Sequence, residues 1–149
     1  MFVQFGPQHP GSHGLIKFTL ELLGETIKNA ILYIGLLHRG TEKLFETRPF
    51  YMGTPYMDRL DYVSTLTSEH AHVLGIEGLI EFQSTSAAFL KIRTVFDEIT
   101  RIKNHLMHIS ILTFDTGNFF LFFFFLEWRE HLMGFYEAVS GARLHAALY

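Results

Sequence analysis

Two types of side chain in this sequence could deliver protons to a flat substrate with two oxygens. Residues 5–14 read FGPQHPGSHG and hold His9 and His13 in a proline-containing loop, and Tyr62 follows inside DRLDY. Reducing a quinone to a quinol needs two electrons and two protons, delivered to oxygens at opposite ends of the ring. Neutral Tyr and His side chains both donate hydrogen bonds, so they suit this chemistry.

The surroundings of Tyr62 are consistent with such a site but do not by themselves establish it. If this segment is helical, Arg59 and Asp58 share a face with Tyr62, and Arg59 could bias the charge near the phenol. A half-buried Tyr beside an Arg–Asp pair is, however, also a common structural arrangement. Spacing alone leaves both interpretations open.

The sequence lacks the residues that other kinds of catalytic or binding chemistry require. The chain has no cysteine, which excludes disulfides, thiolate nucleophiles and iron–sulfur ligation by cysteines of this chain. His105 and His108 share a helical face but have no third ligand at helical spacing, so we expect no metal site. No nucleophile elbow and no glycine-rich phosphate loop occurs. Electrons for any redox reaction must therefore come from a partner or a diffusible cofactor.

The charge balance argues against nucleic acid as a partner. The net charge is −3, the pI is near 6.3 and no basic run occurs. The closest approach to a basic cluster has helical spacing and is expected to form a solvated or partner-facing stripe: Lys91, Arg93, Arg101 and Lys103.

Hydrophobic periodicity predicts an α+β fold. We expect a β-hairpin with strands at 15–21 and 26–34, then a short helix that begins at Thr41. Longer helices are expected at 56–82, 87–112 and 126–148, with a polar link at 83–86. The predicted organisation is an N-terminal hairpin unit, residues 1–36, followed by a helical bundle, residues 37–149.

Residues 119–126 read FFLFFFFL, an unusual run of aromatic side chains. Eight residues are far fewer than the roughly 18–20 that span a bilayer, so we expect a buried helix segment. No secretory or transit segment is visible in the sequence.

Five segments, taken in order, resemble one known family. They read FGPQHPGSHG, IGLLHRGTEKLFE, PYMDRLDYVS, IRTVFDEITRIKNHL and EAVSGARLHAAL. Together they are similar to the quinone-site subunit of respiratory complex I, called subunit 7 or the 49-kDa subunit, which descends from the large subunit of nickel–iron hydrogenases. The resemblance implies a subunit of a proton-pumping NADH:ubiquinone oxidoreductase that is not active alone.

The resemblance also implies roles for individual residues. His13 and Tyr62 match the residues that bind the quinone headgroup, and Asp115 matches an aspartate that pairs with the histidine. Arg59 and His145 match residues near the terminal 4Fe-4S cluster, which a neighbouring subunit ligates. The loop glycines Gly6 and Gly14 would allow the quinone-site loop to shift, and Arg39 is a further residue expected near the cluster.

The same resemblance implies ubiquinone as the substrate and a set of partners. These are the iron–sulfur subunit with the terminal cluster and the membrane-arm subunit at the quinone entrance. The expected location is the matrix side of the mitochondrial inner membrane, with the cytoplasmic side of a bacterial inner membrane as the alternative.

The family subunit continues well beyond the position of Tyr149, where we expect this chain to stop in mid-helix. We therefore expect a second polypeptide to supply the C-terminal part and to cover the apolar faces of residues 87–148. Two alternatives are a non-catalytic assembly fragment of the same complex and a hydrogenase-like subunit, which would need cysteine ligands.

Overall fold

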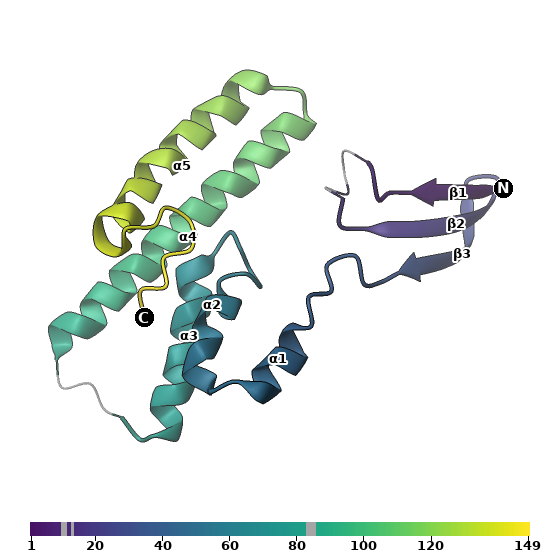
Figure 1. Cartoon of the computed structure of the whole chain (residues 1–149). Helices are drawn as coiled ribbons and strands as arrows, with labels where there is room; N and C mark the ends of the chain where they lie inside the picture. The colour runs from purple at the N-terminus through teal and green to yellow at the C-terminus, as the bar shows by residue number, and fades with distance from the viewer. Residues whose placement is uncertain (10–11, 13, 83–85) are drawn as a thin grey trace. The chain divides into compact units, whose positions relative to one another are not determined.

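The computed structural model describes residues 1–9, 12, 14–82 and 86–149. Contacts within the chain divide it into two compact units, Met1–Leu44 and Phe45–Tyr149. The first unit carries a small sheet and the second carries long helices (Figure 1). The predicted α+β fold, a small antiparallel sheet followed by long helices, is confirmed.

The sheet of the first unit has three antiparallel strands in the order β1-β2-β3. They are β1 (Phe2–Phe5), β2 (Lys17–Leu23) and β3 (Thr26–Tyr33). Leu23 pairs with Thr26, which leaves a two-residue turn that needs the positive φ of 64° at Gly24. The predicted hairpin is therefore present, and β1 is an additional strand that the short N-terminal segment did not reveal.

The loop between β1 and β2 is held by close packing at Gly6. Its φ is 71°, and a Cβ at this position would collide with the backbone carbonyl of Ile16. Ser12 is buried, and its hydroxyl lies 2.8 Å from the carbonyl oxygen of Pro7. Gly6 thus serves a tight backbone approach, whereas Gly14 (φ 78°) has open space around it.

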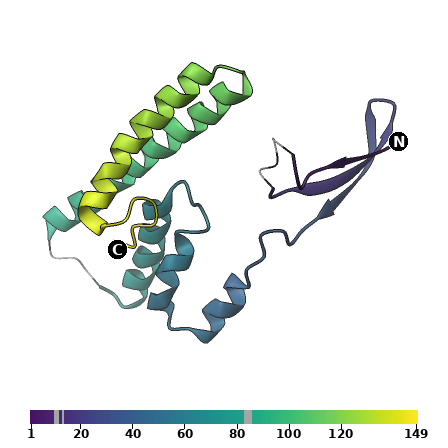
Figure 2. The same ribbon diagram turned by 45° about the horizontal axis from the view of Figure 1, so that its top comes forward.

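The helical unit starts within α1 (Thr41–Thr47) and continues through the 3₁₀ turn η1 (Phe50–Gly53) and the single turn α2 (Thr54–Met57). Three longer helices follow: α3 (Thr65–Leu79), α4 (Ala87–Asp115) and α5 (Phe119–Ser140). The views in Figures 1 and 2 agree that α4 and α5 lie side by side as an antiparallel pair.

The single helix predicted for residues 56–82 is wrong. Residues 58–64 form bends and turns between α2 and α3. The carboxylate of Asp61 accepts hydrogen bonds from the backbone N–H groups of Val63 and Ser64, at 3.2 and 3.3 Å. Such local side-chain bonds compete with helical hydrogen bonds. Tyr62 therefore lies in an irregular segment, and the helical face assumed for Arg59 and Tyr62 does not exist.

The last helix is also displaced from its prediction. It begins at Phe119, where the Asn118 side chain accepts from the backbone N–H of Leu121, and it ends at Ser140. Gly141 adopts φ 77° and closes the helix as a left-handed cap. The predicted helix therefore ends earlier than expected: residues 141–149 form an irregular segment with bends, defined here as the C-terminal strap.

The core of the helical unit lies between α3, α4, α5 and the strap. Its buried members are Leu66, Phe96, Tyr136 and Ala146. Arg93 and Lys103 are buried in the same region, so the predicted solvated stripe is wrong for these two residues. Both share the buried face of α4 with Phe96, whereas Lys91 and Arg101 are exposed.

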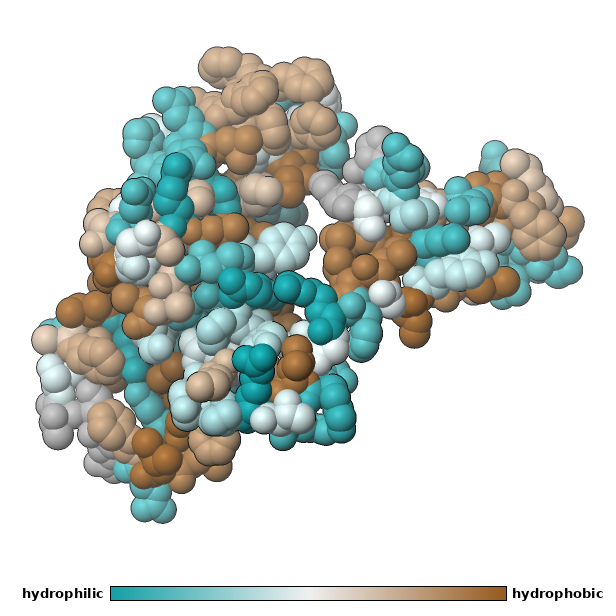
Figure 3. Space-filling view, in the orientation of Figure 1, coloured by the Kyte–Doolittle hydropathy of each residue, from teal (hydrophilic) through white to brown (hydrophobic). Residues whose placement is uncertain are grey.

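The phenylalanine run forms the first two turns of α5 but is not buried within this chain. Phe120 is 76% exposed, and Phe119, Phe123 and Phe124 are exposed as well. Hydrophobic side chains gather at the end where α4 passes into α5 (Figure 3). In this unit α4 is the helix that packs along α5, so one side of the run stays uncovered. Among the described residues, no helix combines the length and apolar character required to cross a bilayer.

Candidate functional site

Tyr62 and Arg59 lie in the irregular segment 58–64 and are both exposed. Tyr62 is 53% exposed, and its hydroxyl makes no hydrogen bond with a described residue. The Arg59 guanidinium donates to the Pro55 carbonyl at 2.6 Å. The phenol is therefore free to meet another molecule.

The remaining predicted residues are spread over both units. Asp115 is the exposed last residue of α4, and the segment that carries Tyr62 contacts that helix through Ser64 and Asn104. Asp115 lies about three turns beyond Asn104, about 16 Å along the axis. Arg39 is exposed in the loop before α1. His13 lies outside the described residues.

His145 stands in the C-terminal strap, beside Asp58. Its Nδ1 atom lies 4.0 Å from Oδ2 of Asp58, and its side chain is about a quarter exposed. Burial, and then the positive charge of Arg59, lower the pKa of His145. The structure thus places Arg59 close enough to His145 for its charge to affect the histidine, although they are distant in sequence.

Glu69 of α3 holds the end of the strap. Its two carboxylate oxygens accept hydrogen bonds from the backbone N–H groups of Ala147 and Leu148, each at 2.8 Å, and of Tyr149 at 3.3 Å. The Thr65 hydroxyl donates to the Leu144 carbonyl at 3.0 Å. Both anchors belong to α3 and they bracket His145, so they fix its place against the helices.

Two further ionisable side chains, Asp58 and Lys103, are buried near His145. Asp58 is fully buried, and burial, followed by the neighbouring Glu69 carboxylate, raises its pKa to about 8. Lys103 of α4 is also fully buried, and its Nζ lies 3.8 Å from the centroid of the Tyr136 ring. Burial, followed by the charge of Arg129, lowers the pKa of Lys103 to about 8.

Tyr149 ties the strap to α3 and α4. Its ring stacks on His70 at a centroid distance of 5.0 Å, and its hydroxyl donates to the Arg93 carbonyl at 3.2 Å. Arg93 makes a two-point ion pair with Glu77 at 2.7 and 2.9 Å. The side chain of His70 in turn lies 2.6 Å from Asp97. The end of the chain is therefore part of the packed unit.

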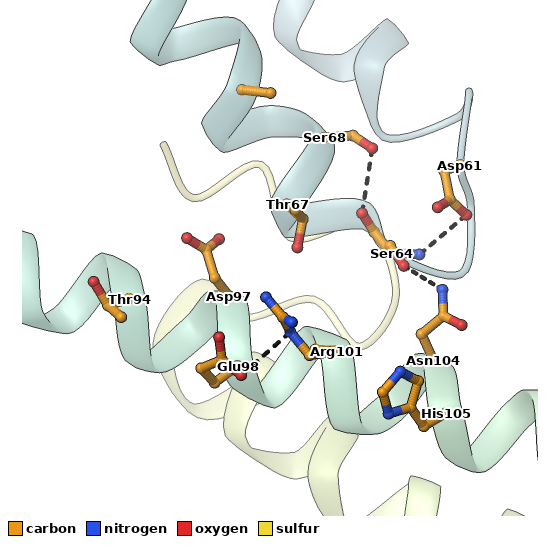
Figure 4. A pocket seen from close by; sticks show the side chains of 11 residues that line it. Asp61, Ser64, Thr67, Ser68, Thr94, Asp97, Glu98, Arg101, Asn104 and His105 are labelled. Atoms are coloured by element: carbon orange, nitrogen blue, oxygen red, sulfur yellow. Dashed lines mark hydrogen bonds and ion pairs between the residues drawn. The ribbon is translucent and has the colours of Figure 1, made fainter.

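A polar pocket of about 610 Å³ lies where segment 58–64 and α3 face α4 (Figure 4). Asp61 and Ser64 line it on one side, and Asp97, Arg101 and His105 line it on the other. Among the described residues of the helical unit, Arg59, Tyr62, Asp115 and His145 are not part of its lining.

The part of the chain that the structure describes contains no group of three or more His, Cys, Asp or Glu side chains placed to hold a metal ion. The residues described above offer hydrogen-bond donors and acceptors and titratable groups. Proton donation and proton exchange are the chemistry that this arrangement can perform.

Comparisons with known proteins show which proteins the chain resembles. No family model matches it. It is 54% identical over 147 residues to an NADH-quinone oxidoreductase subunit of Xanthomonas axonopodis pv. citri. It is 49% identical, over the same length, to the NADH-ubiquinone oxidoreductase 49 kDa subunit of Paramecium tetraurelia. The relatives are subunits of oxidoreductases named for NADH and a quinone.

The chain is a homologue of the 49-kDa subunit of NADH-ubiquinone oxidoreductase and of its bacterial counterpart along 99% of its own length. It spans about a third of these relatives, 34% of the bacterial protein and 37% of the ciliate protein. The sequence resemblance to this family is confirmed, and the partial coverage is consistent with an N-terminal part.

Sequence reasoning missed the buried cluster of Asp58, Glu69 and Lys103. One signal was available: Phe96 and Lys103 are seven residues apart, which places Lys103 on the same face of α4 as a large apolar residue. No pattern in the sequence pairs Glu69 with residues 147–149, because that contact depends on the tertiary fold.

Proposed function

We propose that this chain forms part of the quinone-reducing subunit of an NADH:ubiquinone oxidoreductase. The observation that carries the proposal is the identity of 49–54% to subunits named for this reaction, over 99% of the chain. Quinone reduction, proton pumping and the lack of activity of the isolated chain are parts of this proposal.

In this function Tyr62 and His13 bind the two carbonyl oxygens of ubiquinone and donate protons to them. The exposed phenol of Tyr62, without a hydrogen-bond partner among the described residues, supports the role of Tyr62. Hydrogen-bond donors aimed at developing negative charge stabilise the reduced ring. Asp115 pairs with His13, and Gly6 and Gly14 flank the loop that carries this histidine.

Electrons reach the quinone from a 4Fe-4S cluster that a neighbouring subunit ligates. Arg59, His145 and Arg39 face that cluster in the proposed complex. The positive charge of Arg59, which lowers the pKa of His145, supports a common location for these two residues. A histidine whose charge changes near neutral pH can follow the redox state of a nearby centre.

The partners are the cluster-bearing subunit and the membrane-arm subunit at the quinone entrance. Exposed apolar side chains on α4 and α5 support contact with other parts of the complex, among them Val95, Ile102, Phe120 and Phe123. The proposed location is the matrix side of the mitochondrial inner membrane, or the cytoplasmic side of a bacterial one.

The composition of the native assembly tests this proposal. A tag on this chain would be used to purify the membrane complex, and mass spectrometry would identify the chains that accompany it. We expect the other subunits of the oxidoreductase, including the iron–sulfur subunit with the terminal cluster. Purification of the chain without any of these subunits would overturn the proposal.

A further inference from the structure

The helical unit buries three ionisable side chains that come from different elements. Asp58 belongs to the segment after α2, Glu69 to α3 and Lys103 to α4, and all three are fully buried. Buried charged groups are normally paired or hydrogen-bonded, because removing them from water is costly. Glu69 meets this expectation through the three backbone amides of the strap.

Asp58 does not meet the expectation that a buried charged group is paired. Among the described residues, neither carboxyl oxygen of Asp58 has a hydrogen bond of good geometry, although the Glu69 carboxyl group and the Ala147 backbone lie close enough to change the pKa of Asp58. The ammonium nitrogen of Lys103 likewise has none and rests on the face of the Tyr136 ring instead. A carboxyl group in this position is stable in its protonated, neutral form, which removes the cost of a buried charge.

His145 provides a nearby group that can exchange a proton with Asp58. Its Nδ1 is buried without a hydrogen-bond partner among the described residues, and it faces Oδ2 of Asp58 at 4.0 Å. One atom is a potential proton donor and the other a potential acceptor, and a bridging water or a small side-chain rotation closes such a gap. The His145 side chain is also partly exposed, so the pair connects the buried carboxyl group to the surface.

We propose that Asp58 and His145 form a proton-exchange pair in the helical unit. The O–H bond of the Asp58 carboxyl group breaks and an N–H bond forms at Nδ1 of His145, which leaves a carboxylate and an imidazolium. The imidazolium then loses its Nε2 proton toward the exposed side, and the reverse sequence refills Asp58. Solvent water accepts this proton and returns one in the reverse sequence, and no electron transfer is needed.

The neighbouring charges act on both members of the pair. Lys103 and Arg59 stabilise the carboxylate that remains on Asp58, and Glu69 opposes it. Arg59 and Lys103 disfavour a lasting charge on His145, whereas Glu69 favours it. On the far side, Arg129 and Tyr136 of α5 face Lys103. The pKa of Asp58 near 8 and the lowered pKa of His145 place the proton on Asp58 at neutral pH.

Glu69 and Thr65 are positioning residues in this scheme. They bind the strap on both sides of His145, through Leu144 and through residues 147–149. The inference concerns the helical unit alone and does not rest on the proposed quinone chemistry.

Two spectroscopic measurements on the full chain test the pair, without quinone or reductant. The first is a pH titration of the His145 ring by NMR with labelled histidine. Because the two sites share a proton, the His145 signal should titrate in two steps, one of them near the pKa of Asp58. In Asp58→Asn the upper step should vanish, and in the control Asp61→Asn, an exposed residue of the same segment, both steps should persist.

The second measurement is the infrared C=O stretch of a protonated carboxyl group at pH 7, with labelled aspartate. The unsubstituted chain should show this band, and titration through pH 8 should remove it while a carboxylate band grows. Loss of the band over the same pH range as the upper His145 step supports the pair even if Asp58→Asn fails to fold. A single His145 step that is the same in the unsubstituted chain and in Asp58→Asn, or an aspartate spectrum without a protonated band at pH 7, would overturn the proposal.

Discussion

The carboxylate of Glu69 on α3 accepts the backbone N–H of Ala147 at 2.8 Å, across 78 residues of sequence. Because the neighbouring amides of Leu148 and Tyr149 bind the same side chain, this one residue determines where residues 147–149 lie. The strap then seals the buried cluster and places His145 beside Asp58.

Replacing Glu69 by Gln should release the strap. One carboxylate oxygen becomes an NH₂ group that faces backbone donors, so buried hydrogen bonds are lost and the free energy of unfolding should fall by about 3 kcal/mol. Amide hydrogen exchange at residues 147–149 should accelerate in parallel. The control is Glu98→Gln on α4, an exposed residue whose ion pair with Arg101 contributes little. Equal stability of the two variants would show that the Glu69 clamp is unimportant.

The stability of the helical unit should pass through a minimum near pH 8. Asp58 has its pKa raised from 3.8 to about 8, so its contribution to stability is lost as the pH rises from about 4 to 8. Lys103 has its pKa lowered from 10.5 to about 8, so the unfolded chain binds more protons between about pH 8 and 10.5, and stability rises there.

Urea titrations at several pH values would measure this profile. Asp58→Asn should flatten the branch below pH 8, and Lys103→Met should flatten the branch above it. If both branches persist in both variants, the profile has other causes.

Arg93→Ala should be far more destabilising than Arg101→Ala, although both residues lie on α4. Arg93 is buried, forms a two-point pair with Glu77 and lies 4.2 Å from the centroid of the Phe89 ring. Its loss leaves a partly buried carboxylate without a partner, at a cost of about 3 kcal/mol. Arg101 pairs with Glu98 in solvent, so its loss should cost about 0–1 kcal/mol. Thermal or urea unfolding measures both values, and similar losses would contradict the assignment.

Gly6→Ala should disrupt the loop of the first unit more than Gly14→Ala. Both glycines have positive φ, so alanine strains the backbone by about 1 kcal/mol at either position. At Gly6 the added Cβ also collides with the Ile16 carbonyl, whereas at Gly14 it meets no atom. Amide exchange in β1 and β2 should therefore increase clearly in the Gly6 variant alone. Equal effects would indicate that only the φ strain matters.

Local patterns in the sequence predicted the hairpin and the existence of the helices, because side-chain periodicity and turn residues determine them directly. They failed at residues 58–64, where the Asp61 side chain competes for backbone amides, and at Gly141, which the prediction placed inside a helix. In both cases one polar or glycine residue outweighed a favourable hydrophobic period.

The candidate site was only partly accessible to sequence reasoning. The motif resemblance selected Tyr62, Arg59 and His145, and the structure brings the last two together electrostatically. The burial of Asp58 and Lys103 could not be predicted in full, because their neighbours come from distant segments, as with His145, which lies beside Asp58 but 87 residues further along the chain. A charged residue on a helix is by default expected in solvent.

The rate of quinone reduction by the assembled complex with Tyr62→Phe tests the central proposal most directly. Phenylalanine keeps the ring and removes the O–H donor, and Tyr51→Phe, at another exposed tyrosine of the same unit, is the matched control. A positioned proton donor typically contributes about 10²–10⁴-fold to a rate, so Tyr62→Phe should lose at least ~10-fold, whereas Tyr51→Phe should keep the full rate. Full NADH:ubiquinone reductase activity in a normally assembled Tyr62→Phe complex would contradict the proposed role of this residue.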